Sequence, residues 1–173
     1  MKITILTLFP EMFTNFLETS IIKKTRLQGH VTFYIVNIRD FADNKWNRVD
    51  TPPVGGGAGM ILQAEPIVKA LESVDSGHKL LLSPRGNVLT NMKATALSQK
   101  EHLIFICGHY EGIDERVNNF IDEEISIGDY ILTGGELGAM VISDAAIRLL
   151  DEVISTESLD IESFDYHLLE YPQ

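Results

Sequence analysis

The chain has 173 residues and a mass of 19.3 kDa, which is the usual size of one compact domain. Hydrophobic residues make up 45% of it and charged residues 23%, a balance that excludes an intrinsically disordered chain. The sequence has 25 Asp and Glu against 14 Lys and Arg, giving a net charge of −11. This charge disfavours a plain nucleic-acid-binding module, because phosphate neutralisation supplies most non-specific affinity for nucleic acid.

The sequence contains no apolar stretch near the ~20 residues that a membrane-spanning helix needs. Residues 1–10 are apolar but have no small-residue cleavage site, so we interpret them as a buried strand and not as a signal peptide. Cys107 is the only cysteine and lies in an apolar stretch, which is typical of a reduced compartment. We therefore expect a cytoplasmic protein with no membrane partner.

The first half of the chain alternates between predicted strands and helices. A buried strand is expected at 3–9, and a proline suited to a first helical turn then opens an amphipathic helix at 10–25. A second strand is expected at 31–38. The Pro- and Gly-rich stretch 51–60 predicts an irregular loop, and a short helix follows at 66–72.

The second half continues the alternation. Strands are predicted at 79–82, 102–107 and 124–132. Helices are predicted after the N-cap residue Thr90, at 114–120 and at 136–150, and the acidic segment after them is expected to be loop or linker. This order indicates an α/β fold with a mostly parallel sheet and helices on both faces.

Three glycine-bearing turns follow predicted strands, at 83–86, 108–112 and 128–135. The carboxyl ends of parallel strands share one edge of the sheet, which is also where such sheets bind ligands. We therefore expect the three turns to converge on a pocket. Glycine allows close approach of the main chain, so the pocket is expected to recognise its ligand mainly through main-chain groups.

Other motifs favour plainer interpretations. The run 55–59 fails the dinucleotide-binding pattern because Met60 stands where glycine is needed, so by itself it is interpreted as a flexible loop. The acidic triplet 122–124 cannot direct three carboxylates at one ion from a strand, and a solvated edge is expected. His109 has no His or Cys companion at ligand spacing, so no metal site is predicted.

Six motifs together closely resemble the bacterial tRNA guanine-N1 methyltransferases, in the same order and spacing. They are LTLFPEMF at 6–13, GGGAGM at 55–60, LSPRG at 82–86, CGHYEGIDER at 107–116, SIGDYILTGGE at 126–136 and LLEYPQ at 168–173. The resemblance covers the whole chain. It implies the SPOUT fold with a deep C-terminal trefoil knot, a homodimer with the active site between subunits, and S-adenosylmethionine as cofactor.

The resemblance also implies the site residues. S-adenosylmethionine would be held by Leu82, Ser83, Pro84, Gly86, Gly108, Tyr110, Glu111, Gly112, Ser126, Ile127, Gly128, Asp129, Tyr130, Ile131, Leu132, Gly134 and Gly135. The family methylates guanine N1 next to the tRNA anticodon, with a carboxylate as general base and an arginine that stabilises charge on the guanine. Arg148 matches the arginine. Glu162 stands where the family has the aspartate of an Asp-Ser-Phe motif.

The sequence departs from the family pattern at several positions. Glutamate at 162 moves the carboxylate by about one methylene, and a misplacement of ~1 Å can cost on the order of 10²-fold in rate. Gly138 replaces an expected proline, and Val54 stands where a tyrosine is usual.

The sequence ends at Gln173, inside the family's interdomain linker. We expect a methyltransferase domain at 1–151, a truncated linker at 152–173, and no C-terminal tRNA-binding domain. An excised domain and a short natural relative both fit this ending. We expect the chain to bind the cofactor and to methylate tRNA weakly or not at all. The alternative is a degenerate, non-catalytic module that binds the cofactor and dimerises.

Overall fold

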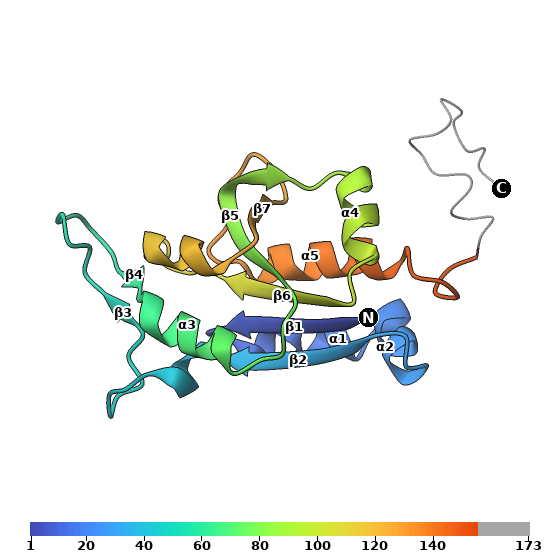
Figure 1. Cartoon of the computed structure of the whole chain (residues 1–173), viewed down its shortest axis with the longest axis horizontal. Helices are drawn as coiled ribbons and strands as arrows, with labels where there is room; N and C mark the ends of the chain where they lie inside the picture. The colour runs from blue at the N-terminus through green and yellow to red at the C-terminus, as the bar shows by residue number, and fades with distance from the viewer. Residues whose placement is uncertain (156–173) are drawn as a thin grey trace.

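The computed structural model describes residues 1–155, and its centre is a sheet of five strands (Figure 1). The strand order is β2-β1-β6-β5-β7, and every pairing between neighbours is parallel. The strands are β1 (Lys2–Thr7), β2 (Thr32–Asn37), β5 (His78–Val88), β6 (His102–Cys107) and β7 (Glu123–Ser126). A separate antiparallel ribbon joins β3 (Asp50–Thr51) to β4 (Ile61–Leu62). The predicted mostly parallel α/β fold is confirmed.

Helices cover both faces of the sheet, as predicted. The α-helices are α1 (Thr14–Leu17), α2 (Ser20–Leu27), α3 (Ala64–Glu72), α4 (Asn91–Ser98) and α5 (Glu136–Ile147), and the 3₁₀ turns are η1 (Pro10–Phe13), η2 (Ile38–Phe41) and η3 (Glu115–Phe120). Helix α5 packs with α4 and the N-terminal helices on one face, whereas α3 and η3 pack on the other. Among residues 1–155, no helix is long and apolar enough to cross a membrane.

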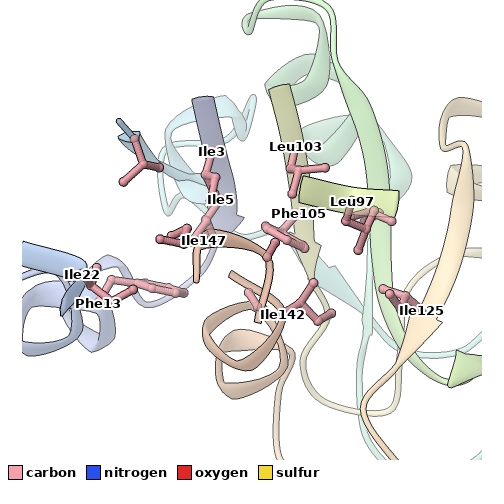
Figure 2. Packing of buried hydrophobic residues seen from close by; sticks show 14 of the residues in the cluster. Ile3, Ile5, Phe13, Ile22, Leu97, Leu103, Phe105, Ile125, Ile142 and Ile147 are labelled. Carbon is pink, nitrogen blue, oxygen red and sulfur yellow. The ribbon is translucent and has the colours of Figure 1, made fainter. Parts of the chain in front are cut away.

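The alternation of side chains along the central strands divides the core into two clusters. Ile5 of β1 and Phe105 of β6 face α5 and its residues Ile142 and Ile147 (Figure 2). The next residue along β6, Ile106, joins the cluster on the opposite face. Every residue of β6 is buried, because a central parallel strand is covered on both faces.

The expectation of one continuous helix at 10–25 is wrong. A 3₁₀ turn and α1 end at Leu17, and α2 begins at Ser20. The break falls at Thr19, whose backbone is extended and whose hydroxyl donates a 2.6 Å hydrogen bond to the Asn15 carbonyl. Ser20 then has a positive φ of 51°. Local hydroxyl bonds of this kind compete with helix continuation, which the apolar spacing cannot reveal.

The structure also revises the strands next to the predicted pocket. β7 ends at Ser126, not at 132, because the Ser126 hydroxyl accepts from the Gly128 N–H at 3.2 Å and donates to the Gly128 carbonyl at 2.9 Å. β5 is longer than expected, since Leu82 and Asn87 both lie opposite Ile125 of β7. The intervening residues 83–86 therefore bulge away from the sheet.

Candidate cofactor site

The turn after β6 and the turn before α5 are in direct contact. The Gly135 N–H donates a 2.9 Å hydrogen bond to the Gly108 carbonyl, and His109 forms an isolated antiparallel bridge with Gly134. These residues belong to two of the three turns predicted to converge. The contact is made by main-chain groups, as the glycine content of the turns predicts.

Leu82, the last residue of β5 before its bulge, also packs against Gly135. A Cβ atom at Gly135 would lie 2.8 Å from the Cys107 Cα and 2.9 Å from the Leu82 Cβ. Real Cβ atoms do not approach other heavy atoms this closely, so only glycine allows the three chain segments to pack here. Gly138 continues the contact one turn into α5, where a Cβ would lie 3.0 Å from the Leu82 Cδ1.

The bulge in β5 is packed onto β7 in the same manner. A Cβ atom at Gly86 would lie 2.4 Å from the backbone nitrogen of Ile125. Beyond the bulge, the Leu89 N–H donates a 2.8 Å hydrogen bond to the Ser126 carbonyl. The first turn is thereby held against β7, the strand that leads into the third turn.

The second turn has a left-handed backbone and is tied to the glycine-rich loop. Tyr110 has φ +61° and Gly112 has φ +128°, values that favour glycine and strain other residues. The Glu111 N–H donates to the Met60 carbonyl at 3.0 Å, and the Leu62 N–H donates to the Gly112 carbonyl at 2.9 Å. The end of the glycine-rich run 55–59 therefore lies next to the turn 108–112.

A buried carboxylate, which the sequence analysis did not single out, lies behind the turns. Glu136 is 2% exposed and accepts a 2.8 Å hydrogen bond from the Thr7 hydroxyl. Its position in the first turn of α5 places its charge at the positive end of the helix dipole. Burial raises the pKa of the Cys107 thiol well above its usual value, and the Glu136 charge adds to this. No local sequence signal marks this glutamate, because its hydrogen-bond partner Thr7 is 129 residues away in the chain.

The His109 ring, within the turn 108–112, packs against two aromatic rings. Its ring centroid lies 4.8 Å from that of Phe9 and 4.9 Å from that of Tyr110. Its Nδ1 atom is buried and makes no hydrogen bond within residues 1–155. In that part of the chain, no group of three or more His, Cys, Asp or Glu side chains is placed to hold a metal ion.

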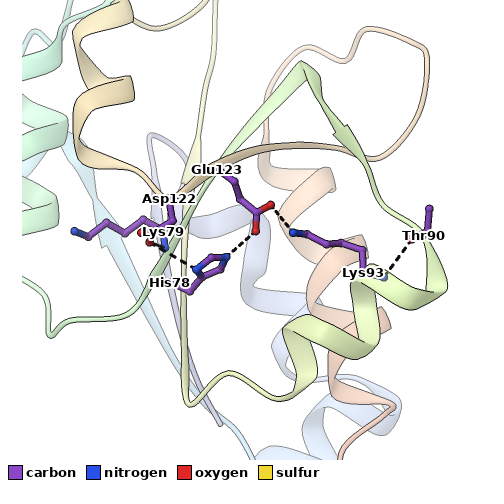
Figure 3. Close-up of polar contacts among 6 residues, drawn as sticks. All are labelled: His78, Lys79, Thr90, Lys93, Asp122 and Glu123. Carbon is purple, nitrogen blue, oxygen red and sulfur yellow. Dashed lines mark hydrogen bonds and ion pairs between the residues drawn. The ribbon is translucent and has the colours of Figure 1, made fainter.

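A polar cluster joins the beginning of β7 to the beginning of β5 and to α4 (Figure 3). Glu123 lies 2.6 Å from the Nε2 atom of His78 and forms an ion pair with Lys93 of α4. Asp122 accepts a 2.7 Å hydrogen bond from the Lys79 N–H. The expectation of a solvated acidic edge is therefore wrong for Glu123, whose side chain is only 16% exposed.

Arg148, the first of the two predicted catalytic residues, lies far from the turns that meet at Gly135. Arg148 caps the C-terminal end of α5, whereas Gly135 caps its N-terminal end. At 1.5 Å per residue, the 13 steps between them span about 20 Å. Glu162 lies outside the described residues 1–155. The structure thus brings together the strand ends and turns assigned to the cofactor, but Arg148 of the same chain lies at the far end of the helix.

Comparisons with known proteins agree on one family. Residues 1–173 match the family described as tRNA (Guanine-1)-methyltransferase TrmD. A tRNA (guanine-N(1)-)-methyltransferase from Carboxydothermus hydrogenoformans is 56% identical over 99% of this chain and 70% of its own length. One from Malacoplasma penetrans is 52% identical over 99% of this chain and 77% of its own. The crystal structure of tRNA (m1G37) methyltransferase from Aquifex aeolicus superposes with a TM-score of 0.83 at 39% identity, covering 90% of this chain and 72% of that one.

Proposed function

The chain belongs to the tRNA (guanine-1)-methyltransferase family, and on this premise we propose that it transfers a methyl group from S-adenosylmethionine to guanine N1 of tRNA, next to the anticodon. The observation that carries the proposal is the contact of Gly135 with Gly108 in the second turn and with Leu82, which directly precedes the first turn. The turns contain the motifs by which the chain resembles the family. They meet at the carboxyl edge of a parallel sheet, where α/β proteins bind ligands.

The residues of the three turns suit a ligand that is recognised through main-chain atoms. Glycines at 86 and 135 leave no room for a Cβ, so main-chain segments pack closely there. The proposed contacts run from Leu82 through the bulge, along residues 108–112, and from Ser126 to Gly135. S-adenosylmethionine bound there would supply an electrophilic methyl group. The protein's task is to hold the guanine in line with that group and to manage its N1 proton.

The two proposed catalytic side chains have distinct tasks. Glu162 accepts the N1 proton as general base, which leaves the electron pair of the broken N–H bond on N1 and makes N1 nucleophilic. Arg148 carries a permanent positive charge and stabilises the negative charge that develops on the guanine. Both roles follow from matching residues to the family motifs.

Homodimerisation is part of the proposal. Because Arg148 lies about 20 Å along α5 from the pocket of its own chain, a second copy must deliver the arginine that acts there. A suitable apolar surface borders the pocket, since Ile131 is 86% exposed and Leu137 and Val141 are about half exposed. Covering these side chains with a second copy removes apolar area from water.

Other family features complete the proposal. We propose that the segment after β7 threads a trefoil knot, and that residues 1–151 form the methyltransferase domain with 152–173 beginning a linker. The protein would act in the cytoplasm, where tRNA is modified.

Two measurements test the proposal. Calorimetric titration with S-adenosylmethionine should give one binding event per subunit. Transfer of labelled methyl to a tRNA transcript should be weak with guanosine beside the anticodon and should vanish with adenosine there. Folded protein that binds no S-adenosylmethionine would refute the cofactor assignment. Equal labelling of both transcripts would refute the assigned target.

A subunit-mixing experiment tests the shared active site. Arg148→Ala homodimers and homodimers with a blocked pocket, Gly135→Val, should each be inactive. A mixed dimer contains one pocket that is intact and faces an intact Arg148, so mixing should restore up to about half of the activity per heterodimer. If the mixture is no more active than the two homodimers added together, the shared site is contradicted.

A second candidate function rests on the glutamate at position 162. If this carboxylate is misplaced, the chain is a non-catalytic module that binds S-adenosylmethionine and dimerises. Glu162→Asp separates the two functions. The enzyme proposal expects methyl transfer by the wild-type protein and a changed rate in Glu162→Asp, whereas the module expects the wild-type protein to bind S-adenosylmethionine and transfer no methyl group.

A further inference from the structure

The only tryptophan of the chain, Trp46, is exposed at the tip of a loop. Trp46 is 77% exposed to solvent, although tryptophan has the largest apolar surface of any side chain. The loop lies between η2 and β3, in the part of the molecule that projects beyond the carboxyl ends of the strands (Figure 1).

The turn that carries Trp46 is held in a defined shape by Asn44. The Asn44 side-chain oxygen accepts hydrogen bonds from the Trp46 N–H at 3.2 Å and the Arg48 N–H at 2.9 Å. The Asn44 amide donates to the Arg48 carbonyl at 2.7 Å, and the Asn47 N–H donates to the Asn44 carbonyl at 3.0 Å. The indole is therefore presented on a preorganised turn, which lowers the entropy lost when a ligand stacks on it.

The charge of this turn is opposite to that of the whole chain. Residues 44–48 contain two cations, Lys45 and Arg48, and no carboxylate, whereas the chain carries a net charge of −11. The Lys45 Nζ lies 4.7 Å from the centroid of the Trp46 ring. Arg48 is 3.5 Å from Asp50, and its side chain remains 63% exposed. An aromatic face flanked by exposed cations suits a base with its adjoining phosphates.

The turn lies on the same edge of the molecule as the pocket. It leads within four residues, at most about 14 Å, into β3 at Asp50. β3 pairs with β4, whose Leu62 N–H is bonded to the Gly112 carbonyl in the pocket turn. A second link joins Arg39 of η2 to the Tyr110 hydroxyl at 3.4 Å. Ligands at the turn and in the pocket are thus neighbours.

We propose that Trp46 stacks on an unpaired base of the RNA substrate close to the methylated guanine, while Lys45 and Arg48 contact the adjoining phosphates. This inference rests on the proposed function, because it assigns a contact for the same RNA. Single-stranded loops are recognised by stacking on aromatic side chains, and each stacked base contributes substantially to affinity. Trp46 is a positioning residue, since it touches the RNA away from the reacting atoms.

Steady-state kinetics of methyl transfer tests the proposal. Trp46→Ala should raise KM for a tRNA transcript between about 5-fold and about 100-fold, with kcat within about twofold and the dissociation constant for S-adenosylmethionine unchanged. Trp46→Phe should recover most of the loss. Tyr34→Ala is the matched control, because Tyr34 is also a surface aromatic with a lysine 4.6 Å from its ring centroid. An unchanged KM in Trp46→Ala, with active wild-type protein, would overturn the inference and leave the proposed function standing.

Fluorescence provides a readout that does not depend on catalysis. Because Trp46 is the only tryptophan in the chain, its emission should be quenched when a tRNA transcript is titrated and should stay constant with S-adenosylmethionine alone. Quenching by tRNA without methyl transfer would support the stacking contact while the proposed function fails. Emission that stays constant throughout the tRNA titration would overturn the contact. A shift of Trp46→Ala from dimer to monomer in sedimentation would assign Trp46 to a subunit interface and also overturn it.

Discussion

Replacing Gly135 by alanine tests whether close main-chain packing creates the cofactor site. The backbone at Gly135 has φ −80° and ψ −10°, which alanine adopts without strain. The only new feature is a methyl group placed 2.8 Å from the Cys107 Cα, 2.9 Å from the Leu82 Cβ and 3.1 Å from the Gly108 nitrogen. None of these atoms is the end of a flexible side chain. The three segments must therefore move apart.

The structure sets the size of the expected effect. Moving from 2.8 Å to an ordinary carbon contact of about 3.5 Å requires a displacement of about 0.7 Å. Overpacking of this kind costs about 1–3 kcal/mol, against which the stiffer unfolded chain of the alanine variant returns up to about 1 kcal/mol. The displacement also stretches the 2.9 Å bond from Gly135 to Gly108. We expect weaker S-adenosylmethionine binding, by about 10-fold or more.

Urea unfolding and calorimetric titration measure the two effects separately. Gly55→Ala is the control, because a Cβ at Gly55 meets nothing within 4 Å and the residue has no positive φ. We expect Gly55→Ala to match the wild type in both measurements. An alanine variant of Gly135 with wild-type stability and wild-type cofactor affinity would refute the reasoning that links the glycine contact to the pocket.

Three further predictions concern the scaffold. Burial opposes ionisation of Glu123, but hydrogen bonds from Lys93 and His78 outweigh it and hold the pKa of that carboxyl below its ordinary value. Glu123→Gln should therefore cost about 1–3 kcal/mol at neutral pH, and in urea titrations the difference should shrink below about pH 4.5 as the carboxyl becomes protonated. Thr90→Ala should lower the unfolding free energy by about 1 kcal/mol and Thr90→Ser should not, because the Thr90 hydroxyl accepts from the Lys93 N–H at 3.2 Å. Burial raises the pKa of Cys107, so a thiol reagent should label it only after unfolding; rapid labelling of the native protein would contradict this.

The central strands are the part of the fold that the sequence predicts best. The predicted strand 102–107 matches β6 to the residue, because the residues after His102 form the continuous apolar run that is typical of a strand covered on both faces. The elements flanking the pocket were predicted less well. β7 ends early because the Ser126 hydroxyl bonds to the main chain of Gly128, whereas the bulge in β5 depends on Asn87 returning to pair with Ile125 after four residues outside the sheet. That pairing is a tertiary contact and leaves no periodic signal.

In the candidate site too, features with a local sequence signal were predicted, and features that depend on distant contacts were not. The convergence of three turns follows from the rule that parallel strands share a carboxyl edge, and glycines at close contacts are visible in the sequence. The buried Glu136 was not predicted, because its hydrogen-bond partner Thr7 lies 129 residues away in the chain. Nothing local distinguishes this glutamate from the exposed acidic residues that usually occupy a first helical turn.

The segment from Ser126 to Gly135 contains positions under two different constraints. Gly135 is fixed by atoms of its own chain, because no other residue fits against Cys107 and Leu82. Ile131 is not constrained by packing within its own chain, since it is 86% exposed. Its apolar side chain therefore contributes no burial energy to the fold of a single chain. A segment with both kinds of position has two contacts to make. One side packs in the proposed cofactor pocket, and the other side offers an apolar surface to a second body. Under the proposed function Arg148 has to come from another subunit, so we propose that this body is a second copy of the chain. On this reasoning, cofactor binding and dimerisation are coupled through one ten-residue segment, and Ile131→Asp should weaken both without touching a single main-chain contact of the pocket.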